Sequence, residues 1–140
     1  MAIRNIRVDG DDILRKVCKP VKEMTPRTMT LIEDMFDTMY DANGVGLAAP
    51  QVGILKRLVV IDVMDDNPLV LINPVITEQD GEQVGDEGCL SLPGVRRTTR
   101  YETITVEFQD TSFKKQKEVF HGYTAQIIQH EIDMTDGILI

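Results

Sequence analysis

The sequence predicts a single α+β domain over residues 1–140, strand-rich in the middle, with a long helix in the N-terminal half and a second helix near the C-terminus. Three observations support this prediction. A length of 140 residues is about one domain. Apolar residues recur at helical spacing in two segments, and short β-branched runs lie between them. The composition, 42% hydrophobic and 27% charged, is typical of a globular protein and excludes a wholly disordered chain.

The first helix is expected over residues 26–43. Thr25 suits the position that caps a helix, and Pro26 suits the first helical residue. Asn43-Gly44 is a typical helix end. One face is expected to be buried, with its methionines as core residues, because apolar side chains recur every three or four positions: Met29, Ile32, Met35, Phe36 and Met39.

β-Branched or alternating runs predict the strands. Asn73-Pro74 is expected to end one of them, and a polar stretch covers residues 78–86. The second helix is expected over residues 123–134. The expected strands cover residues 58–63, 69–72, 75–77, 103–108 and 118–120.

The charge pattern and the cysteines exclude several classes of protein. Fifteen basic and 23 acidic residues give a net charge of −8, so neither a nucleic-acid partner nor a basic tail is expected. No apolar run approaches the roughly 18 residues of a membrane span, so no membrane partner is expected. No secretory signal opens the chain, which indicates a cytoplasmic protein with free thiols. Cys18 is either an incidental thiol or one whose thiolate the neighbouring lysines favour.

The second helix carries the sequence Gln129-His130-Glu131-Ile132-Asp133-Met134. A metal helix of the His-Glu-x-x-His type has two imidazoles on one face, and its glutamate acts as a general base. Here the fifth position is Met134, so this signal alone is weak, and an isolated helical His-Glu pair is usually structural. Cys89 could add a thiolate ligand, although a cysteine between Gly88 and Leu90 is most often a small buried residue.

A third motif changes this interpretation. Gly44-Val45-Gly46-Leu47-Ala48-Ala49-Pro50-Gln51 is followed by Glu87-Gly88-Cys89-Leu90-Ser91 and by the His-Glu segment that ends at Gly137. In order and spacing, the three segments resemble the motifs of peptide deformylases over about residues 13–140. The resemblance implies a peptide deformylase-like fold and removal of the formyl group from N-formylmethionyl peptides during protein synthesis. It also implies one bound divalent metal ion. Fe²⁺ is the first candidate, and Zn²⁺ and Ni²⁺ are alternatives.

The resemblance also implies roles for individual residues. Cys89 and His130 match metal ligands, and Glu131 matches the general acid and base. Gln51 and the backbone N–H of Leu90 match the donors that stabilise the oxyanion on the formyl carbon. Such chemistry suits a formamide, whose hydrolysis at neutral pH needs a strong nucleophile and preorganised donors.

Four further positions match the substrate site of the family. The backbone of Gly46 would pair with an extended peptide, and a glycine there allows close approach. Val45 and Ile127 fall where the family lines its methionine pocket, which is expected to be apolar. Arg96 lies where a basic side chain can meet the extended substrate. Any contact with the ribosome is expected to be transient or to use the globular surface.

Met134 departs from the family, which has a second histidine ligand at this position. A thioether is a soft ligand and binds Fe²⁺ or Zn²⁺ poorly compared with imidazole. His121 is expected on the opposite helix face, Asp133 matches a supporting position, and Glu131 would be lost as the base if it became a ligand. Water could also complete a two-ligand site.

Three hypotheses therefore remain open at this point. The first is a deformylase with a weakened or unusual metal site. The second is a catalytically weakened or inactive relative that retains the fold and formyl-peptide binding. The third is an unrelated α+β binding domain. Bound metal per chain separates the first two.

Overall fold

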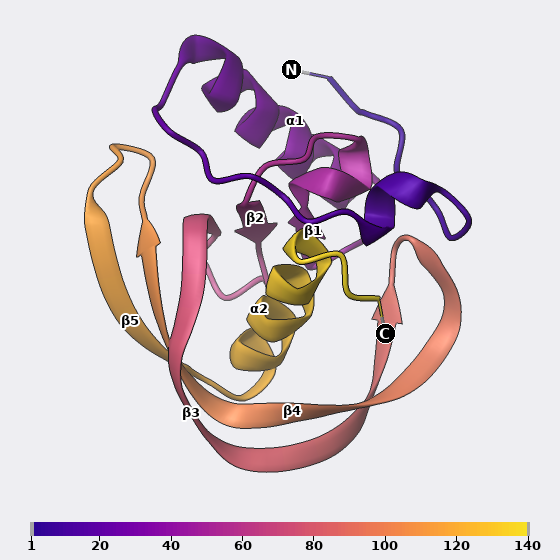
Figure 1. The fold of residues 1–140 in the computed structure, drawn as a ribbon. Coiled ribbons are helices and arrows are strands. Elements are labelled where there is room, and N and C mark those ends of the chain that lie inside the picture. The colour runs from indigo at the N-terminus through magenta and orange to yellow at the C-terminus, as the bar shows by residue number, and fades with distance from the viewer. Residues whose placement is uncertain (1, 140) are drawn as a thin grey trace.

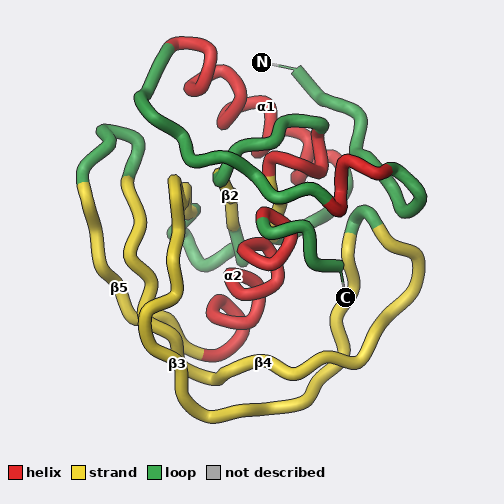
Figure 2. Tube along the Cα trace, in the orientation of Figure 1, coloured by secondary structure: helices red, strands yellow, loops and turns green. Residues whose placement is uncertain are grey.

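The sheet of this protein wraps around its C-terminal helix (Figure 1). The structure is a computed structural model that describes residues 2–139, so the first and last residues of the expected domain lie outside it. Over this range the chain forms two α-helices, two short 3-10 helices and five strands (Figure 2). The elements are, in order, η1 (Asp12–Arg15), α1 (Pro26–Asp41), β1 (Gly46–Ala48), η2 (Ala49–Val52), β2 (Leu58–Ile61), β3 (Leu69–Cys89), β4 (Leu92–Gln109), β5 (Lys115–His121) and α2 (Gly122–Thr135).

The five strands follow one another in the sheet in chain order, and each neighbouring pair is antiparallel. β1 pairs with β2 alone and therefore forms one edge of the sheet. β3 and β4 form a long hairpin that curves around α2 (Figure 1). This arrangement confirms the α+β class and brings β1, the β3–β4 turn and α2 together.

Two apolar clusters lie on the two faces of β2. Val59 and Ile61 belong to a core that α2 and the strands β3, β4 and β5 complete. Leu58 and Val60 point to the other side, where α1 packs over β1 and β2. Because successive side chains of a strand point to opposite faces, a strand covered by helices on both sides needs four apolar residues in a row. This requirement explains why all four residues of β2 are buried.

Both predicted helices are present, and the caps explain where α1 begins. Thr25 Oγ1 accepts a hydrogen bond from the backbone N–H of Thr28 at 3.1 Å, as the capping pattern predicted. Met35 and Met39 are fully buried, but Met29 is exposed, so its assignment to the core was wrong. No helix in the described part of the chain is both long and apolar enough to cross a membrane.

The prediction that a strand ends at Asn73-Pro74 was wrong. β3 continues to Cys89 through a register shift between Ile72 and Val75, which absorbs the missing N–H of Pro74. Asn73 adopts a positive φ of 52° and is held by its side chain, which accepts from Val21 N at 2.7 Å and donates to Val21 O at 2.8 Å.

The polar segment 78–86, for which no strand was predicted, is also part of β3. Nearly all of its residues are exposed, so neither face carries the alternation that identifies a half-buried strand. Its partner β4 likewise begins at Leu92, well before the predicted start at Thr103. The hairpin is held here by backbone hydrogen bonds, which leave no apolar pattern in the sequence.

Candidate active site

A cavity of about 510 Å³ lies where the residues before and at the start of β1, the end of β3 and one face of α2 meet. Gly46 comes from β1, Cys89 from the last position of β3, and His130 and Glu131 from α2. Three sequence segments that are far apart in the chain therefore contribute to one site. The two-residue turn Leu90-Ser91 joins β3 to β4 at the rim of this site.

Seven of the ten residues singled out from the sequence line this cavity, and they include the thiol, the imidazole and the carboxylate. The cavity does not include Gln51, Arg96 or Met134. The seven are Val45, Gly46, Cys89, Leu90, Ile127, His130 and Glu131.

Gln51 lies directly behind the cavity wall, beside Cys89. Its Nε2 donates to Ser91 Oγ at 3.0 Å and approaches Cys89 Sγ at 3.9 Å. Its Oε1 accepts from Ala48 N at 2.9 Å. Because the carboxamide is buried and held at both ends, its N–H group has a fixed orientation next to the cysteine.

The other two residues outside the cavity lie in different environments. Arg96 is exposed on β4, opposite Glu87 in the strand register. Met134 is only 1% exposed and packs in the apolar core that α2 shares with the sheet. His121 does not replace a ligand, because it lies at the start of α2 and its Nδ1 is within 3.1 Å of Thr103 Oγ1.

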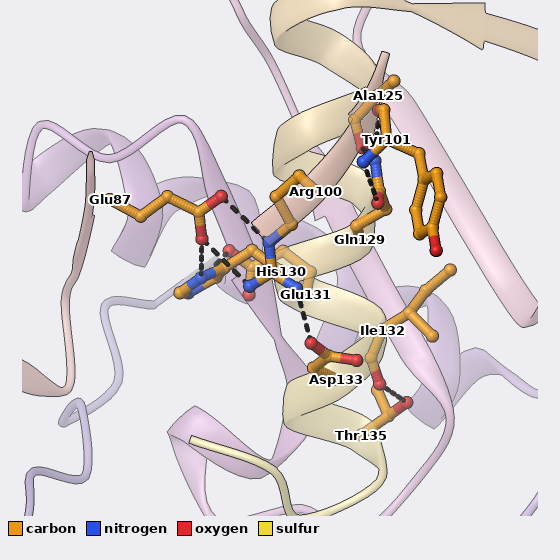
Figure 3. Close-up of polar contacts among 10 residues, drawn as sticks. All are labelled: Glu87, Arg100, Tyr101, Ala125, Gln129, His130, Glu131, Ile132, Asp133 and Thr135. Carbon is orange, nitrogen blue, oxygen red and sulfur yellow. Dashed lines mark hydrogen bonds and ion pairs between the residues drawn. The ribbon is translucent and has the colours of Figure 1, made fainter. Parts of the chain in front are cut away.

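His130 is held by a chain of charged side chains (Figure 3). Its Nδ1 lies 3.1 Å from Glu87 Oε1, and Arg100 donates to both oxygens of Glu87 at 2.9 Å. Arg100 also donates to Asp133 Oδ2 at 2.6 Å. This contact agrees with the supporting role expected for Asp133. Since Nδ1 is engaged with a carboxylate, Nε2 is the nitrogen left for the cavity.

The same contacts shift the ionisation of the paired groups. Burial would raise the pKa of Glu87, but hydrogen bonds from His130 and Arg100 outweigh it and lower the pKa to about 2. Burial would lower the pKa of His130, but hydrogen bonds with Cys89 and Glu87 and the charge of Glu131 raise it to about 10. Glu87 therefore stays ionised and provides a fixed negative charge behind the imidazole.

Glu131 differs from Glu87, because it is buried without matching partners. Its Oε1 is a buried polar atom with no hydrogen-bond partner among the described residues. Its Oε2 lies 4.0 Å from His130 Nε2. Burial raises the pKa of Glu131 to about 7. A Cβ at position 46 would lie 2.7 Å from Glu131 Oε2, so a larger residue there would force this carboxylate to shift.

The donor set fits a divalent metal through two protein ligands rather than three. A thiol and an imidazole line the cavity together, and both are ligands that first-row metals accept. Among residues 2–139, no group of three or more histidine, cysteine, aspartate or glutamate side chains is arranged to hold a metal. The unpaired Oε1 of Glu131 indicates that the site has a further polar group to bind.

Two cavity residues on α2 were missed from the sequence. Tyr123 and Gln126 line the cavity on the same face of α2 as Ile127, His130 and Glu131. The other four residues follow Tyr123 by three, four, seven and eight positions, a spacing that would have identified this helix face. The motif did not include them, because it begins at Gln129.

Cys18 is not a reactive thiol. It is 5% exposed, and its backbone N–H donates to Thr135 O at 2.9 Å. Burial raises the pKa of this thiol to about 11, so the interpretation that nearby lysines favour its thiolate was wrong.

Comparison of the whole chain with known proteins identifies its family. The family model for polypeptide deformylase matches residues 3–140. The chain belongs to the polypeptide deformylase family. The match confirms the resemblance identified from three motifs. Members of this family are hydrolytic enzymes.

Individual deformylases are similar over nearly the whole chain. The peptide deformylase of Agathobacter rectalis is 54% identical over 140 residues, which cover 99% of this chain and 88% of the relative. That of Lachnoclostridium phytofermentans is 56% identical over 142 residues, with 99% and 87% covered.

Solved deformylase structures share the fold. The crystal structure from Thermotoga maritima has a TM-score of 0.94 at 44% identity, covering 98% of this chain and 94% of that one. A class I type b deformylase from Acinetobacter baumannii has a TM-score of 0.96 at 35% identity, covering 99% and 97%. The fold class predicted from the sequence is therefore confirmed.

Proposed function

We propose that this chain hydrolyses the formamide of N-formylmethionyl peptides, with a divalent metal held by Cys89 and His130. The observation that carries this proposal is the buried carboxylate of Glu131, whose Oε1 is unpaired and whose Oε2 lies near His130 and Gly46. Fe²⁺ is the first candidate, and Zn²⁺ and Ni²⁺ are alternatives. When bound, the metal would supply the Lewis acidity that makes hydroxide available near neutral pH.

Glu131 moves the proton in this proposal. Its raised pKa of about 7 suits a group that must accept a proton and return it at neutral pH. The carboxylate has a free oxygen in the cavity, and no described residue competes for that oxygen. It can therefore take a proton from the attacking water and give it to the leaving amine.

Gln51 and Leu90 stabilise the oxyanion. The carboxamide of Gln51 is held beside Cys89, and Leu90 lies in the tight turn that follows Cys89. Two N–H donors fixed in position before the reaction need no reorganisation as negative charge develops on the formyl oxygen.

The peptide binds as an extended strand beside β1. The free edge of β1 begins at Gly46, next to Glu131, and Val45 and Ile127 line the same cavity. Backbone groups of an edge strand are available to pair with an added peptide. Arg96 is exposed on β4 and would meet more distant parts of the substrate. A transient ribosome contact would bring such peptides to the cavity in the cytoplasm.

A second candidate function is formyl-peptide binding without turnover. It is favoured by Met134, whose thioether is 1% exposed among core residues instead of facing the cavity. With two protein ligands the metal would be held more weakly than by three.

Turnover of formyl-Met-Ala-Ser by anaerobically purified protein tests the proposal. We expect Glu131→Gln to lower turnover by about 100-fold or more, because a positioned acid–base group contributes at least that much. Glu107→Gln, which changes an exposed carboxylate on β4, is the matched control and should leave turnover unchanged.

Binding of the same peptide without turnover would contradict the first function and support the second. The peptide's dissociation constant, measured by calorimetry on the same sample, separates the two outcomes.

A further inference from the structure

The segment that precedes η1 is held to the protein by its backbone. Residues 2–8 form neither helix nor strand, and most of their side chains are exposed. Ala2 N donates to Asp34 Oδ1 at 2.7 Å and Arg4 N donates to Thr38 Oγ1 at 2.8 Å, and both acceptors belong to α1. Figure 1 shows this segment in indigo, leading from the N-terminus to η1.

The end of this segment contacts the two elements that carry the expected oxyanion donors. Arg7 N donates to Gln51 O at 2.7 Å, and Asp9 N donates to Ser91 O at 2.7 Å. Gln51 belongs to η2, and Ser91 lies in the turn between β3 and β4. The side chains of these two acceptors also meet, because Gln51 Nε2 donates to Ser91 Oγ at 3.0 Å. Residues 7–9 therefore close a ring of three hydrogen bonds behind the cavity.

Apolar packing does not explain why residues 7–9 lie here. Val8, between the two donors, is 57% exposed, and the side chains of Arg7 and Asp9 are exposed as well. Hydrophobic stabilisation requires apolar surface to be removed from water, and little is removed at these three residues. The two backbone hydrogen bonds are therefore what joins this part of the segment to the site.

A tight turn directs the second of these donors. Asp11 N donates to Val8 O at 3.0 Å, so Asp9 is the second residue of a four-residue turn. Gly10, the third residue, has a positive φ of 100°. A positive φ at the third position is typical of a type II turn, whose second position commonly accepts proline. Proline at position 9 would therefore keep this turn and remove only its N–H donor.

The ring restrains both groups that we expect to stabilise the oxyanion. Gln51 is held through its backbone oxygen by Arg7 and through its carboxamide by Ser91. Ser91 directly follows Leu90, so the contact of its carbonyl with Asp9 restrains the short turn that carries the Leu90 N–H. Donors stabilise a developing charge best when they are fixed before the reaction.

We propose that residues 7–9, here called the N-terminal clamp, position Gln51 and the Leu90 turn for oxyanion stabilisation. The inference rests on the proposed function, which assigns these two donors to the formyl oxygen. Arg7, Val8 and Asp9 do not line the cavity, so the clamp does not contact the peptide. Because it acts on groups that bind the transition state, it raises kcat and leaves KM unchanged.

Asp9→Pro tests the clamp by removing one of its two donors. The comparison variant is Asp9→Ala, which keeps the N–H and loses only a carboxylate 3.6 Å from the exposed Arg15. With formyl-Met-Ala-Ser as substrate, we expect kcat to be about tenfold lower in Asp9→Pro than in Asp9→Ala, at equal KM. This loss is smaller than the roughly 100- to 1,000-fold typical of removing an oxyanion donor outright.

Thr111→Pro is the matched control for the introduction of a proline. Thr111 is the exposed second residue of a turn between β4 and β5, which Phe113 N closes on Asp110 O at 2.8 Å. None of these three residues lines the cavity. Thr111→Pro should therefore keep the kcat and the KM of the unmodified protein.

Amide hydrogen exchange of the unmodified protein tests the clamp without any variant. Val8 N has no hydrogen-bond partner among residues 2–139, whereas Arg7 N and Asp9 N each have one. After correction for intrinsic rates, Arg7 and Asp9 should exchange at least about fivefold more slowly than Val8, the order of one hydrogen bond. Equal rates at the three positions would overturn the inference, even if Asp9→Pro did not fold.

The kinetic outcomes separate this inference from the proposed function. Equal kcat in Asp9→Pro and Asp9→Ala, or a higher KM at unchanged kcat, would overturn the clamp and leave the reaction standing. Absence of turnover in the unmodified protein would contradict the reaction instead. Exchange of the Gln51 carboxamide protons then decides the inference: faster exchange in Asp9→Pro than in Asp9→Ala supports it, and equal exchange overturns it.

Discussion

Two successive turns of α2 carry the same motif but differ in their surroundings. His130 faces the cavity, and its Nδ1 contacts Glu87, which Arg100 in turn links to Asp133. Met134, one turn later, is 1% exposed among apolar side chains. The first turn is organised as a polar site, and the second has become part of the core.

This difference shows that the hydrogen bonds supporting His130 are present although position 134 is a core methionine. Glu87 and Arg100 are among the most buried charges of the molecule, and burying charges is costly unless each is paired. Asp133, between the two turns, completes that pairing. We therefore expect the helix turn at His130 to bind metal and the turn at Met134 to contribute only to the packing of the core.

The largest effect is expected from His130→Ala, which removes the supported side chain. Bound metal per chain should fall to background, because Cys89 alone remains as a ligand on the cavity wall. Elemental analysis of purified protein measures this change. His121→Ala is the matched control, since it removes the other, exposed histidine. Equal metal content in both variants would show that His130 is not a ligand.

A smaller effect is expected from Arg100→Met, which leaves Glu87 and Asp133 without their cation. The loss of an outer partner of a metal-binding histidine typically costs about 10- to 100-fold in metal affinity. Breaking a buried pair should also lower the free energy of unfolding by about 3 kcal/mol. Competition with a chelator and chemical denaturation measure the two changes.

Arg97→Met is the control for this variant, because Arg97 and Asp86 form an exposed pair at 3.6 Å. If Arg100→Met and Arg97→Met have the same metal affinity, the buried hydrogen bonds do not organise His130.

The smallest effect is expected from Met134→Leu. The two side chains have similar volume, so the free energy of unfolding should change by less than about 1.5 kcal/mol. Metal per chain should not change, because the thioether lies in the core and not on the cavity wall. A clear loss of metal with the fold intact would mean that Met134 is a ligand after all.

Local patterns predicted the helices well and the long strands poorly. Thr25 and Pro26 mark the start of α1 because capping depends on a few neighbouring residues. The length of β3 could not be predicted, because Asn73-Pro74 resembles a strand end. The contact of Asn73 with Val21, 52 residues earlier, allows the strand to continue.

The candidate reacting groups could be proposed from the sequence because they lie in three motifs that resemble those of a known family. Their environment could not. Whether position 134 faces the cavity or the core depends on packing between α2 and the sheet. The polar lining around Gln126 of α2 is also a property of the assembled cavity, since Asp86 and Glu87 come from β3.

Metal per chain in anaerobically purified protein, measured beside Met134→His, tests the central claim most directly. We expect close to one metal per chain in the unmodified protein, held by Cys89 and His130, with tighter binding in the variant. A two-ligand metal site would be contradicted if the unmodified protein held no metal even after addition of Fe²⁺, Ni²⁺ or Zn²⁺, while Met134→His bound one.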